Sequence, residues 1–476
     1  MISDELTFRI LQTFSHLPTA EQRQAIETFS RFMTDRRDHT CMVLRGSAGT
    51  GKTTLAAAMV QALAALQQKM VLLAPTGRAA KVFSLYAGHP AYTIHRRIYR
   101  QKSMEGAFTL NYNTAQDTLF IVDEASMIAN ATHGGDTPFA TGQLLDDLIA
   151  FVYGGRNCRL LLIGDRAQLP PVGETESPAL QTDVLRQYGL SVVECDLTEV
   201  LRQSRQSGIL WNATRIRSEG LETEDEPLAL PQIRFRDFDD IRHVPGDELI
   251  ETLASSYSRV GLDETMVVTR SNKRANIYNQ GIRNQILGRE EELCAGDLLM
   301  VVKNNYYWLS SASKSDDSYI ANGDRAVVRR VRNVHEQYGF RFAEVTMTFP
   351  DYDDYELTAT VLLDTLTAEA PALTREQQEL LYNKVMDDYA DVPLKTDRQK
   401  KVREDKYYNA LQVKFAYAAT CHKAQGGQWA HVYIDQGYMT DDMLTPDYLH
   451  WLYTAFTRAT NQLFLVNWPA TQTDNT

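Results

Sequence analysis

An eight-residue segment, Gly46–Thr53, constrains the fold of this chain more than any other feature of the sequence. It reads GSAGTGKT and matches the pattern GxxxxGK[ST] in full. The apolar run Cys41–Leu44 precedes it and the Ala/Leu-rich stretch Thr53–Gln68 follows it, so the segment is expected between a buried strand and a helix. Backbone N–H groups of such a loop wrap around phosphates, and the helix N-terminus adds a favourable dipole. The alternative, a Gly-rich turn that happens to precede a helix, is disfavoured by these flanks.

A second motif supplies the acids that a nucleoside triphosphate site needs. The apolar run Leu119–Val122 ends in Asp123 and Glu124. Adjacent acids more often begin a solvated helix, but at the end of a buried strand Asp123 suits Mg²⁺ and Glu124 suits the base that activates water. Lys52 is expected to reach the β- and γ-phosphates, and Thr53 to ligate Mg²⁺. Together these features predict ATP and Mg²⁺ as cofactors; the predicted nucleotide contacts in the loop are Gly46, Ser47, Ala48, Gly49, Thr50, Gly51, Lys52, Thr53 and Thr54.

Continuous apolar runs flanked by helical patterns recur along the chain. They indicate parallel sheets buried on both faces, and therefore an α/β fold with two cores. The runs are Met70–Ala74, Leu119–Val122, Leu160–Ile163, Val192–Val193, Met266–Val268, Val432–Ile434 and Leu463–Val466. We expect a first core at 1–84 and 117–189, a small insertion at 85–116, a second core at 190–300 and 412–476, and an inserted domain at 301–411. The inserted domain is strand-like at first, and its charged part, 375–408, suits a surface helix.

Composition narrows the class of protein. The 49 Lys and Arg residues against 61 Asp and Glu give a net charge of −12, which disfavours a nucleic-acid binder with a basic outer face but not one with cations lining a groove. No run of about 18 apolar residues occurs, so no membrane span is expected. The N-terminus has no signal-peptide pattern, and five scattered cysteines form no CxxC pair. We therefore expect a cytoplasmic protein with reduced thiols and no zinc site.

Four further stretches follow predicted strands: Ala74–Ala80 (APTGRAA), Leu162–Val172 (LIGDRAQLPPV), Ala419–Gly426 (ATCHKAQG) and Tyr453–Ala459 (YTAFTRA). Within the second, the amide of Gln168 is able to sense a γ-phosphate. With the phosphate loop and the acid pair, this ordered set resembles the motifs of superfamily-1 DNA helicases, closest to the RecD and Dda branch, from Thr19 to about Leu465. The resemblance implies two RecA-like cores, a wedge insertion in the first core and a small β-barrel in the inserted domain.

The resemblance also implies roles for residues outside the phosphate loop. Gln22 would read the adenine edge, unless it is an exposed glutamine at a helix start. Arg202 and Arg458 would approach the γ-phosphate from the second core, unless they form surface ion pairs. Gly426 and Gln428 would lie near the nucleotide. The family usually carries Glu where this chain has Gln428, so either a contact to the nucleotide sugar or the coupling between the two sites is expected to change.

By the same resemblance, single-stranded DNA would be held by Pro75, Thr76, Thr93, His95, Asn322, Thr420, His422 and Lys423. Such residues bind phosphates without reading bases, although either histidine could be purely structural. The predicted function is an ATP-dependent DNA helicase or translocase acting 5′ to 3′ on single-stranded and tailed duplex DNA. Two alternatives stay open: an ATP-switched nucleic-acid clamp or remodeller with little unwinding, and an RNA-directed helicase. The sequence indicates no protein partner, and we expect a monomer.

Overall fold

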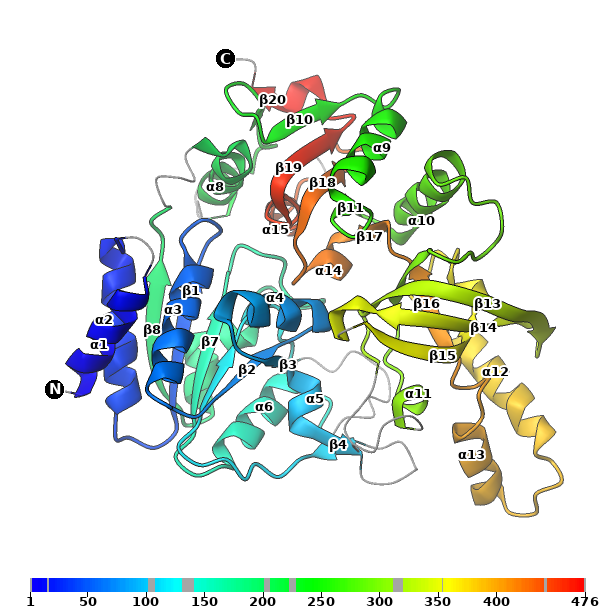
Figure 1. Cartoon of the computed structure of the whole chain (residues 1–476), viewed down its shortest axis with the longest axis horizontal. Coiled ribbons are helices and arrows are strands. Elements are labelled where there is room, and N and C mark those ends of the chain that lie inside the picture. The colour runs from blue at the N-terminus through cyan, green and yellow to red at the C-terminus, as the bar shows by residue number, and fades with distance from the viewer. Residues whose placement is uncertain are drawn as a thin grey trace.

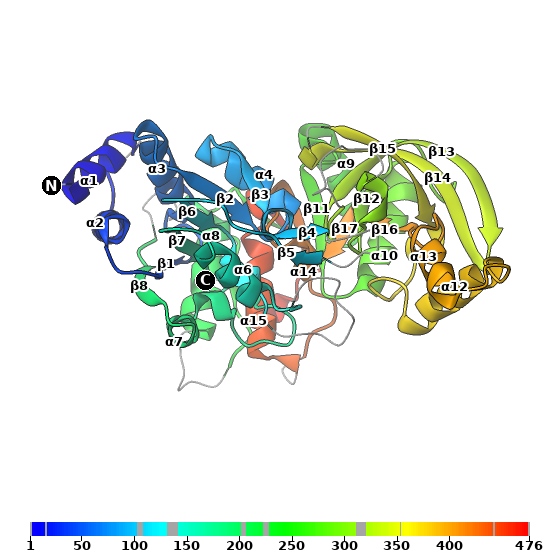
Figure 2. The same cartoon turned by 90° about the horizontal axis from the view of Figure 1, so that it is seen from below.

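The computed structural model of the chain describes residues 2–14, 17–101, 108–130, 141–200, 206–221, 228–310, 320–352, 354–440 and 443–474. These residues form two helix-covered sheets and a closed barrel (Figure 1). In Figure 1 the first sheet, blue to green, lies below the second, green to red, and the mostly yellow barrel lies to their right. Figure 2 shows the N-terminal helix and the barrel at opposite ends of the molecule.

The first sheet has six strands in the order β3-β2-β6-β7-β1-β8, and all its pairs are parallel. Its strands are β1 (Thr40–Gly46), β2 (Met70–Ala74), β3 (Ala91–Thr93), β6 (Leu119–Val122), β7 (Arg159–Gly164) and β8 (Ser191–Leu197). Its helices are α1 (Ile2–Thr13), α2 (Ala20–Thr34), α3 (Lys52–Ala65), α4 (Gly77–Ala87), α5 (Ile94–Ile98), α6 (Leu144–Tyr153) and α7 (Thr182–Gln187).

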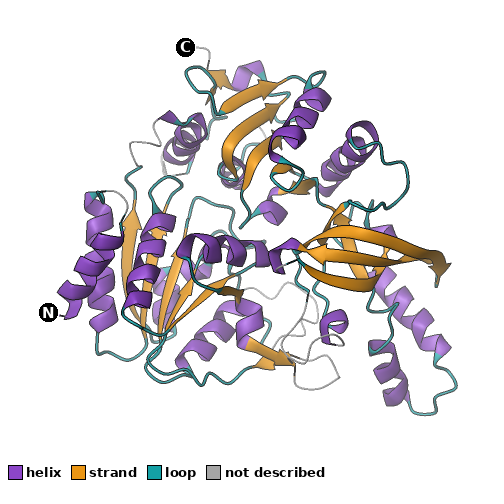
Figure 3. Cartoon of the chain, viewed as in Figure 1, coloured by secondary structure: helices purple, strands orange, loops and turns teal. Residues whose placement is uncertain are grey.

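Both faces of this sheet are buried, as Figure 3 shows by the helices around it. Successive side chains of a strand point to opposite faces. Met42 and Leu44 of β1 pack with residues of α1, α2 and α3, whereas Cys41 and Val43 pack with residues of α5, α6 and α7. The continuous apolar runs therefore fold as expected for a parallel sheet between two helical layers.

The second sheet has five strands in the order β10-β19-β18-β11-β17, again all parallel. Its strands are β10 (Ile241–Val244), β11 (Thr265–Thr269), β17 (Ala418–Thr420), β18 (Trp429–Asp435) and β19 (Ala459–Val466). Its helices are α8 (Gly208–Gly220), α9 (Leu249–Val260), α10 (Asn272–Gly281), α14 (Cys421–Ala424) and α15 (Pro446–Phe456), and a two-stranded pair joins β9 (Ile233–Arg234) to β20 (Thr473–Asp474).

The inserted domain is a closed barrel of five strands. They are β12 (Leu298–Val301), β13 (Arg325–Gln337), β14 (Phe340–Phe349), β15 (Tyr355–Leu362) and β16 (Leu411–Phe415), and the short helix α11 (Tyr307–Ser310) follows β12. The charged segment forms α12 (Arg375–Asp388) and α13 (Lys395–Arg403). Leu381, Val385 and Val402 of these helices pack against Phe340 and Phe342, which gives this end of the barrel its own small core.

The predicted α/β class with two RecA-like cores and a barrel is confirmed, but the predicted boundaries need correction. Strand β8 pairs with β1, and Arg45 of β1 forms ion pairs of 2.6 Å with Glu194 and Asp196, so the segment 190–197 belongs to the first core and not to the second. The short apolar pair Val192–Val193 indicated a strand but carried no information about its partner strand.

The two insertions also differ from their predicted limits. The barrel includes β12 and β16 and so extends beyond 301–411 on both sides. Within the described part of 85–116, β3 is a strand of the first sheet, whereas β4 (Tyr99–Gln101) and β5 (Phe108–Leu110) pair with each other outside that sheet. Part of the predicted insertion therefore belongs to the first core.

No helix in the described ranges has both the length and the apolar character needed to cross a bilayer. All five cysteines are described and none forms a disulfide.

Candidate nucleotide and nucleic-acid site

The loop between β1 and α3 requires its glycines. Gly49 and Gly51 have φ of 79° and 83°, a backbone region that L side chains rarely adopt. A Cβ on Gly46 would lie 2.8 Å from Oγ1 of Thr50, so a larger residue would displace the loop. The GxxxxGK[ST] pattern thus corresponds to a tight loop that leads into a helix N-terminus, which is the geometry of a phosphate cradle.

Lys52 begins α3 and its ammonium turns back over this loop. Lys52 Nζ donates to the carbonyl oxygen of Ser47 at 2.9 Å and also to that of Gly46. It lies 3.7 Å from Oδ2 of Asp165, a buried carboxylate just after β7. Asp165 was not among the predicted site residues, although it follows a buried strand as Asp123 does.

Asp123 and Glu124 lie at the end of β6. Asp123 Oδ1 accepts from the backbone N–H of Glu124 at 2.9 Å, and its Oδ2 accepts from the hydroxyl of Tyr86. Burial raises the pKa of both carboxyls, while Lys52 lowers the pKa of each. Glu124 has a φ of 54°, in the left-handed region, which is strain of the kind found at functional sites. Tyr86 lies within the predicted insertion 85–116, but it belongs to α4 and its hydroxyl orients Asp123.

The residues predicted for Mg²⁺ fit that ion in their chemistry. Thr53 is exposed in the first turn of α3, and Asp123 is a carboxylate at the neighbouring strand end. Mg²⁺ prefers oxygen ligands and usually takes only one or two from the protein, with phosphate and water completing the octahedron. No group of three or more His, Cys, Asp or Glu side chains suited to hold a metal occurs among the described residues.

Two buried glutamines at this site differ in their hydrogen bonding. The side chain of Gln168 is buried, and among the described residues its Oε1 has no hydrogen-bond partner. Gln22 is also buried, not exposed at a helix start: its Nε2 donates to the carbonyl oxygen of Thr50 at 2.9 Å, and its Oε1 accepts from Thr19 N at 3.0 Å. Gln22 therefore supports the loop, and its adenine contact stays a prediction.

Arg458 is a buried residue of the second core whose charge acts on Glu124 of the first core. It follows α15, is 2% exposed, and donates to the carbonyl oxygens of Thr454 at 3.0 Å and Gly427 at 3.1 Å. Its positive charge lowers the pKa of Glu124, against the effect of burial. Arg458 is therefore not a surface ion pair. The other predicted arginine, Arg202, lies outside the described residues.

Two further second-core residues contact the phosphate loop and were not predicted. Tyr453 Oη accepts from the backbone N–H of Ala48 at 2.7 Å and donates to Asp165 Oδ2 at 2.8 Å. Arg217 of α8 donates to the hydroxyl of Ser47. Tyr453 is part of the YTAFTRA motif, so the sequence could have indicated it as a site residue. Arg217 lies in an ordinary helical pattern that does not distinguish it from its neighbours.

The predicted nucleic-acid contacts with hydroxyl groups share one position, between a strand end and a helix start. Thr76, Thr93 and Thr420 precede α4, α5 and α14. The hydroxyl oxygens of Thr76 and Thr93 accept from the N–H groups of Ala79 at 3.2 Å and Arg96 at 3.3 Å. Each hydroxyl still has its own proton to donate to a phosphate.

One contact between domains joins two of the predicted nucleic-acid residues. Lys423 Nζ donates to Oδ1 of Asn322 at 2.7 Å, which links the second core to the inserted domain. Burial lowers the pKa of Lys423 to about 8 and that of His95 to about 4. Pro75 is half-buried and His422 is exposed. His95 is therefore neutral at pH 7, and Lys423 keeps most of its charge.

The segment around Gly426 packs against the first core. A Cβ on Gly426 would lie 3.1 Å from Oγ1 of Thr76, and Arg78 Nη2 donates to the carbonyl oxygen of Gln428 at 3.1 Å. The side chain of Gln428 is exposed. These two residues therefore contact α4, and their nucleotide contacts stay predictions.

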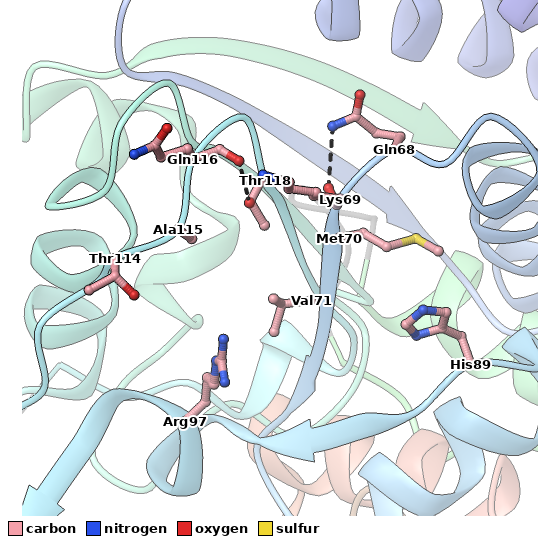
Figure 4. A pocket seen from close by; sticks show the side chains of 10 residues that line it. All are labelled: Gln68, Lys69, Met70, Val71, His89, Arg97, Thr114, Ala115, Gln116 and Thr118. Carbon is pink, nitrogen blue, oxygen red and sulfur yellow. Dashed lines mark hydrogen bonds between the residues drawn. The ribbon is translucent and has the colours of Figure 1, made fainter.

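A separate hollow of 460 Å³ lies at the other end of the first sheet (Figure 4). It opens at the starts of β2 and β6, opposite the strand ends that carry Ala74 and Asp123. Its lining residues are Gln68, Lys69, Met70, Val71, His89, Arg97, Thr114, Ala115, Gln116 and Thr118. None of them is a predicted site residue.

Comparison with known proteins agrees with this geometry. The family model described as an AAA domain matches residues 18–230, and the model of a UvrD-like helicase C-terminal domain matches 415–466. The ATP-dependent DNA helicase dda of Enterobacteria phage T4 is 24% identical over 446 residues, covering 87% of this chain and 91% of that protein. These matches make the chain similar to the superfamily-1 helicases over most of its length.

The predicted resemblance to the RecD and Dda branch is thereby confirmed. This helicase is also 34% identical over 175 residues to the ATP-dependent RecD2 DNA helicase of Deinococcus radiodurans, an alignment that spans 37% of the chain but only 21% of that relative. Among solved structures it is similar to a Pif1 helicase from Bacteroides in complex with ADP-AlF3 and single-stranded DNA, with 15% identity, a TM-score of 0.46, and coverage of 96% of this chain and 94% of that one.

Proposed function

We propose that this helicase is an ATP-dependent DNA translocase that moves 5′ to 3′ along single-stranded DNA and separates duplex ahead of it. One observation carries the proposal. The charge of Arg458, from the second core, acts on Glu124, which lies beside Asp123 and within the electrostatic reach of Lys52 in the phosphate loop of the first core. Nucleotide bound there contacts both cores, so its binding and hydrolysis change how the cores sit against each other.

Each residue has a distinct part in hydrolysis. The loop N–H groups and Lys52 bind the β- and γ-phosphates, and Thr53 and Asp123 hold Mg²⁺, which when bound neutralises phosphate charge. Glu124, whose pKa is raised by burial, takes the proton of the attacking water. Arg458 stabilises the charge that develops on the γ-phosphate, and Gln168 orients the attacking water, which donates to its unsatisfied Oε1.

The same geometry supports a grip on a sugar–phosphate backbone. Thr76 and Thr93 lie at strand ends of the first core, Thr420 and Lys423 at the matching edge of the second, and Asn322 beside Lys423. Hydroxyl, amide and ammonium donors contact phosphates of any sequence, as a translocase requires. The 5′ to 3′ direction rests on the RecD and Dda resemblance.

The test is strand separation of duplexes that carry a 5′ or a 3′ single-stranded tail, with Lys52→Ala as the inactive control. We expect ATP-dependent unwinding from 5′ tails. Unwinding only from 3′ tails would overturn the direction, and DNA-stimulated ATPase without unwinding would identify a clamp or remodeller. Stimulation of ATPase by single-stranded RNA above that by DNA of equal length would identify an RNA-directed enzyme.

A further inference from the structure

Helix α15 contacts the first core through three side chains on one face. His450 Nδ1 donates to the carbonyl oxygen of Ala167 at 2.9 Å, and Thr454 Oγ1 accepts from the N–H of Leu169 at 2.7 Å. The third side chain is Tyr453. All three bond to the loop that follows β7, so this loop and α15 move together unless several buried hydrogen bonds break.

Tyr453 alone extends this contact to the phosphate loop. Its side chain is 1% exposed, and its hydroxyl joins the N–H of Ala48 to the carboxylate of Asp165, which in turn lies 3.7 Å from the ammonium of Lys52. The hydroxyl oxygen of Tyr453 thus contacts both the backbone of the phosphate loop and Asp165, the ion-pair partner of Lys52. Hydrogen bonds of this kind weaken steeply when donor and acceptor separate, so a small shift of α15 alters both contacts.

Helix α15 also lies against the helix that carries two of the predicted DNA contacts. Helix α14, which carries His422 and Lys423, packs on α15, and the thiol of Cys421 donates to the carbonyl oxygen of Trp451 at 3.6 Å. Gln425, just after α14, donates to the carbonyl oxygen of Leu169 at 2.8 Å. DNA that displaces α14 therefore displaces α15 and the loop after β7.

We propose that Tyr453 is the positioning residue through which DNA bound at α14 acts on the phosphate loop. The inference rests on the proposed function. It assigns the coupling between the DNA and nucleotide sites to one hydroxyl group. Such a coupling is reciprocal: if DNA changes the affinity for nucleotide, nucleotide changes the affinity for DNA by the same factor.

The test compares Tyr453→Phe with Tyr448→Phe in the full chain. Tyr448 is a matched control on the same helix, because it is equally buried and its hydroxyl donates to Gln436 Oε1 at 2.6 Å within the second core. The measured quantity is the ratio of dissociation constants for a labelled oligo(dT) strand with and without Mg²⁺ and a non-hydrolysable ATP analogue. Ratios of roughly 5- to 150-fold are typical of coupled sites.

We expect wild type and Tyr448→Phe to share one ratio in that range, and Tyr453→Phe to bring it to within about twofold of one. A substitution that merely disturbed the fold would weaken the binding of both oligo(dT) and the ATP analogue without changing this ratio. An unchanged ratio in Tyr453→Phe would overturn the inference and leave the proposed function standing. A wild type without DNA-stimulated ATPase or unwinding would overturn the proposed function itself.

Thr454→Val provides a second variant should Tyr453→Phe fail to fold. It removes the acceptor for Leu169 N and cuts the neighbouring α15 contact without touching the phosphate loop. We expect the ratio of dissociation constants for this variant to lie between the wild-type ratio and one. A wild-type ratio in this variant would overturn the assignment of coupling to α15.

Discussion

Glu124→Gln separates the chemical step from nucleotide binding. Gln has nearly the same volume as Glu and differs at this position by one charge and one proton acceptor. The side chain of Glu124 lies among Lys52 and Arg458, which lower its pKa, and Asp123 and Asp165, which raise it together with burial. Removing its negative charge also removes repulsion toward a bound triphosphate, so ATP affinity should stay equal or increase.

The expected loss of turnover follows from the role of a general base. Such groups contribute typically about 10²–10⁴-fold, which corresponds to roughly 3–5 kcal/mol in the barrier. The same change should stabilise the folded protein. The folded-state pKa of Glu124 is raised, so the folded chain holds this proton more tightly, and wild-type stability falls as pH rises between the unfolded and folded pKa values. The advantage of Glu124→Gln in Tm should therefore grow with pH across that window and stay constant above it.

Single-turnover hydrolysis with saturating oligo(dT), fluorescent ATP binding and thermal unfolding against pH measure these three effects. Glu379→Gln is the matched control, because its side chain is 63% exposed on α12, in the inserted domain. Turnover within about threefold of wild type would refute the assignment of the base and would leave Asp165 as the next acid to test. A Tm difference that narrows with rising pH would refute the cause given for the pKa shift.

Three other variants test single groups. Lys52→Ala should abolish turnover and weaken ATP binding, because it removes the cation of the phosphate loop; an unchanged KM for ATP would contradict this. Arg458→Lys keeps the charge but cannot keep the guanidinium bonds, and steady-state ATPase should fall by roughly 10³-fold or more. Lys423→Met should flatten the pH dependence of oligo(dT) binding: burial lowers the pKa of Lys423 to about 8, so wild-type affinity should fall as pH rises through 8 and the variant should lack this fall.

The nucleotide-binding part of the site could be predicted because its residues stand in short contiguous motifs. Gly46–Thr53 and Asp123–Glu124 are each contiguous, and their flanks determine that both lie at strand ends. The contacts that join the cores are not local. Tyr453 meets Ala48 across 405 residues, and apolar periodicity reports burial and element type but not which side chains meet.

The boundary between the cores was wrong for the same reason. Strand β8 reads like any half-buried strand, and only its pairing with β1 and the ion pairs of Arg45 place it in the first sheet. Likewise the Lys423–Asn322 contact joins two domains across 101 residues. Motif order could suggest both as DNA contacts, but the hydrogen bond between them depends on how the barrel sits on the second core.

The acidic composition and the proposed grip on DNA are compatible if the grip depends little on charge. Of the predicted DNA contacts only Lys423 is charged at pH 7. Burial lowers the pKa of both His95 and His422, and the threonines, Asn322 and Pro75 do not titrate. Each phosphate neutralised in a single strand contributes about 0.7 to the slope of log Kd against log salt, so one such contact weakens binding only about threefold between 50 and 200 mM salt. Titration of oligo(dT) binding over that range should therefore give a shallow slope. A loss of a hundredfold or more would require several further cations on the strand, and would show that the grip lies elsewhere on the surface.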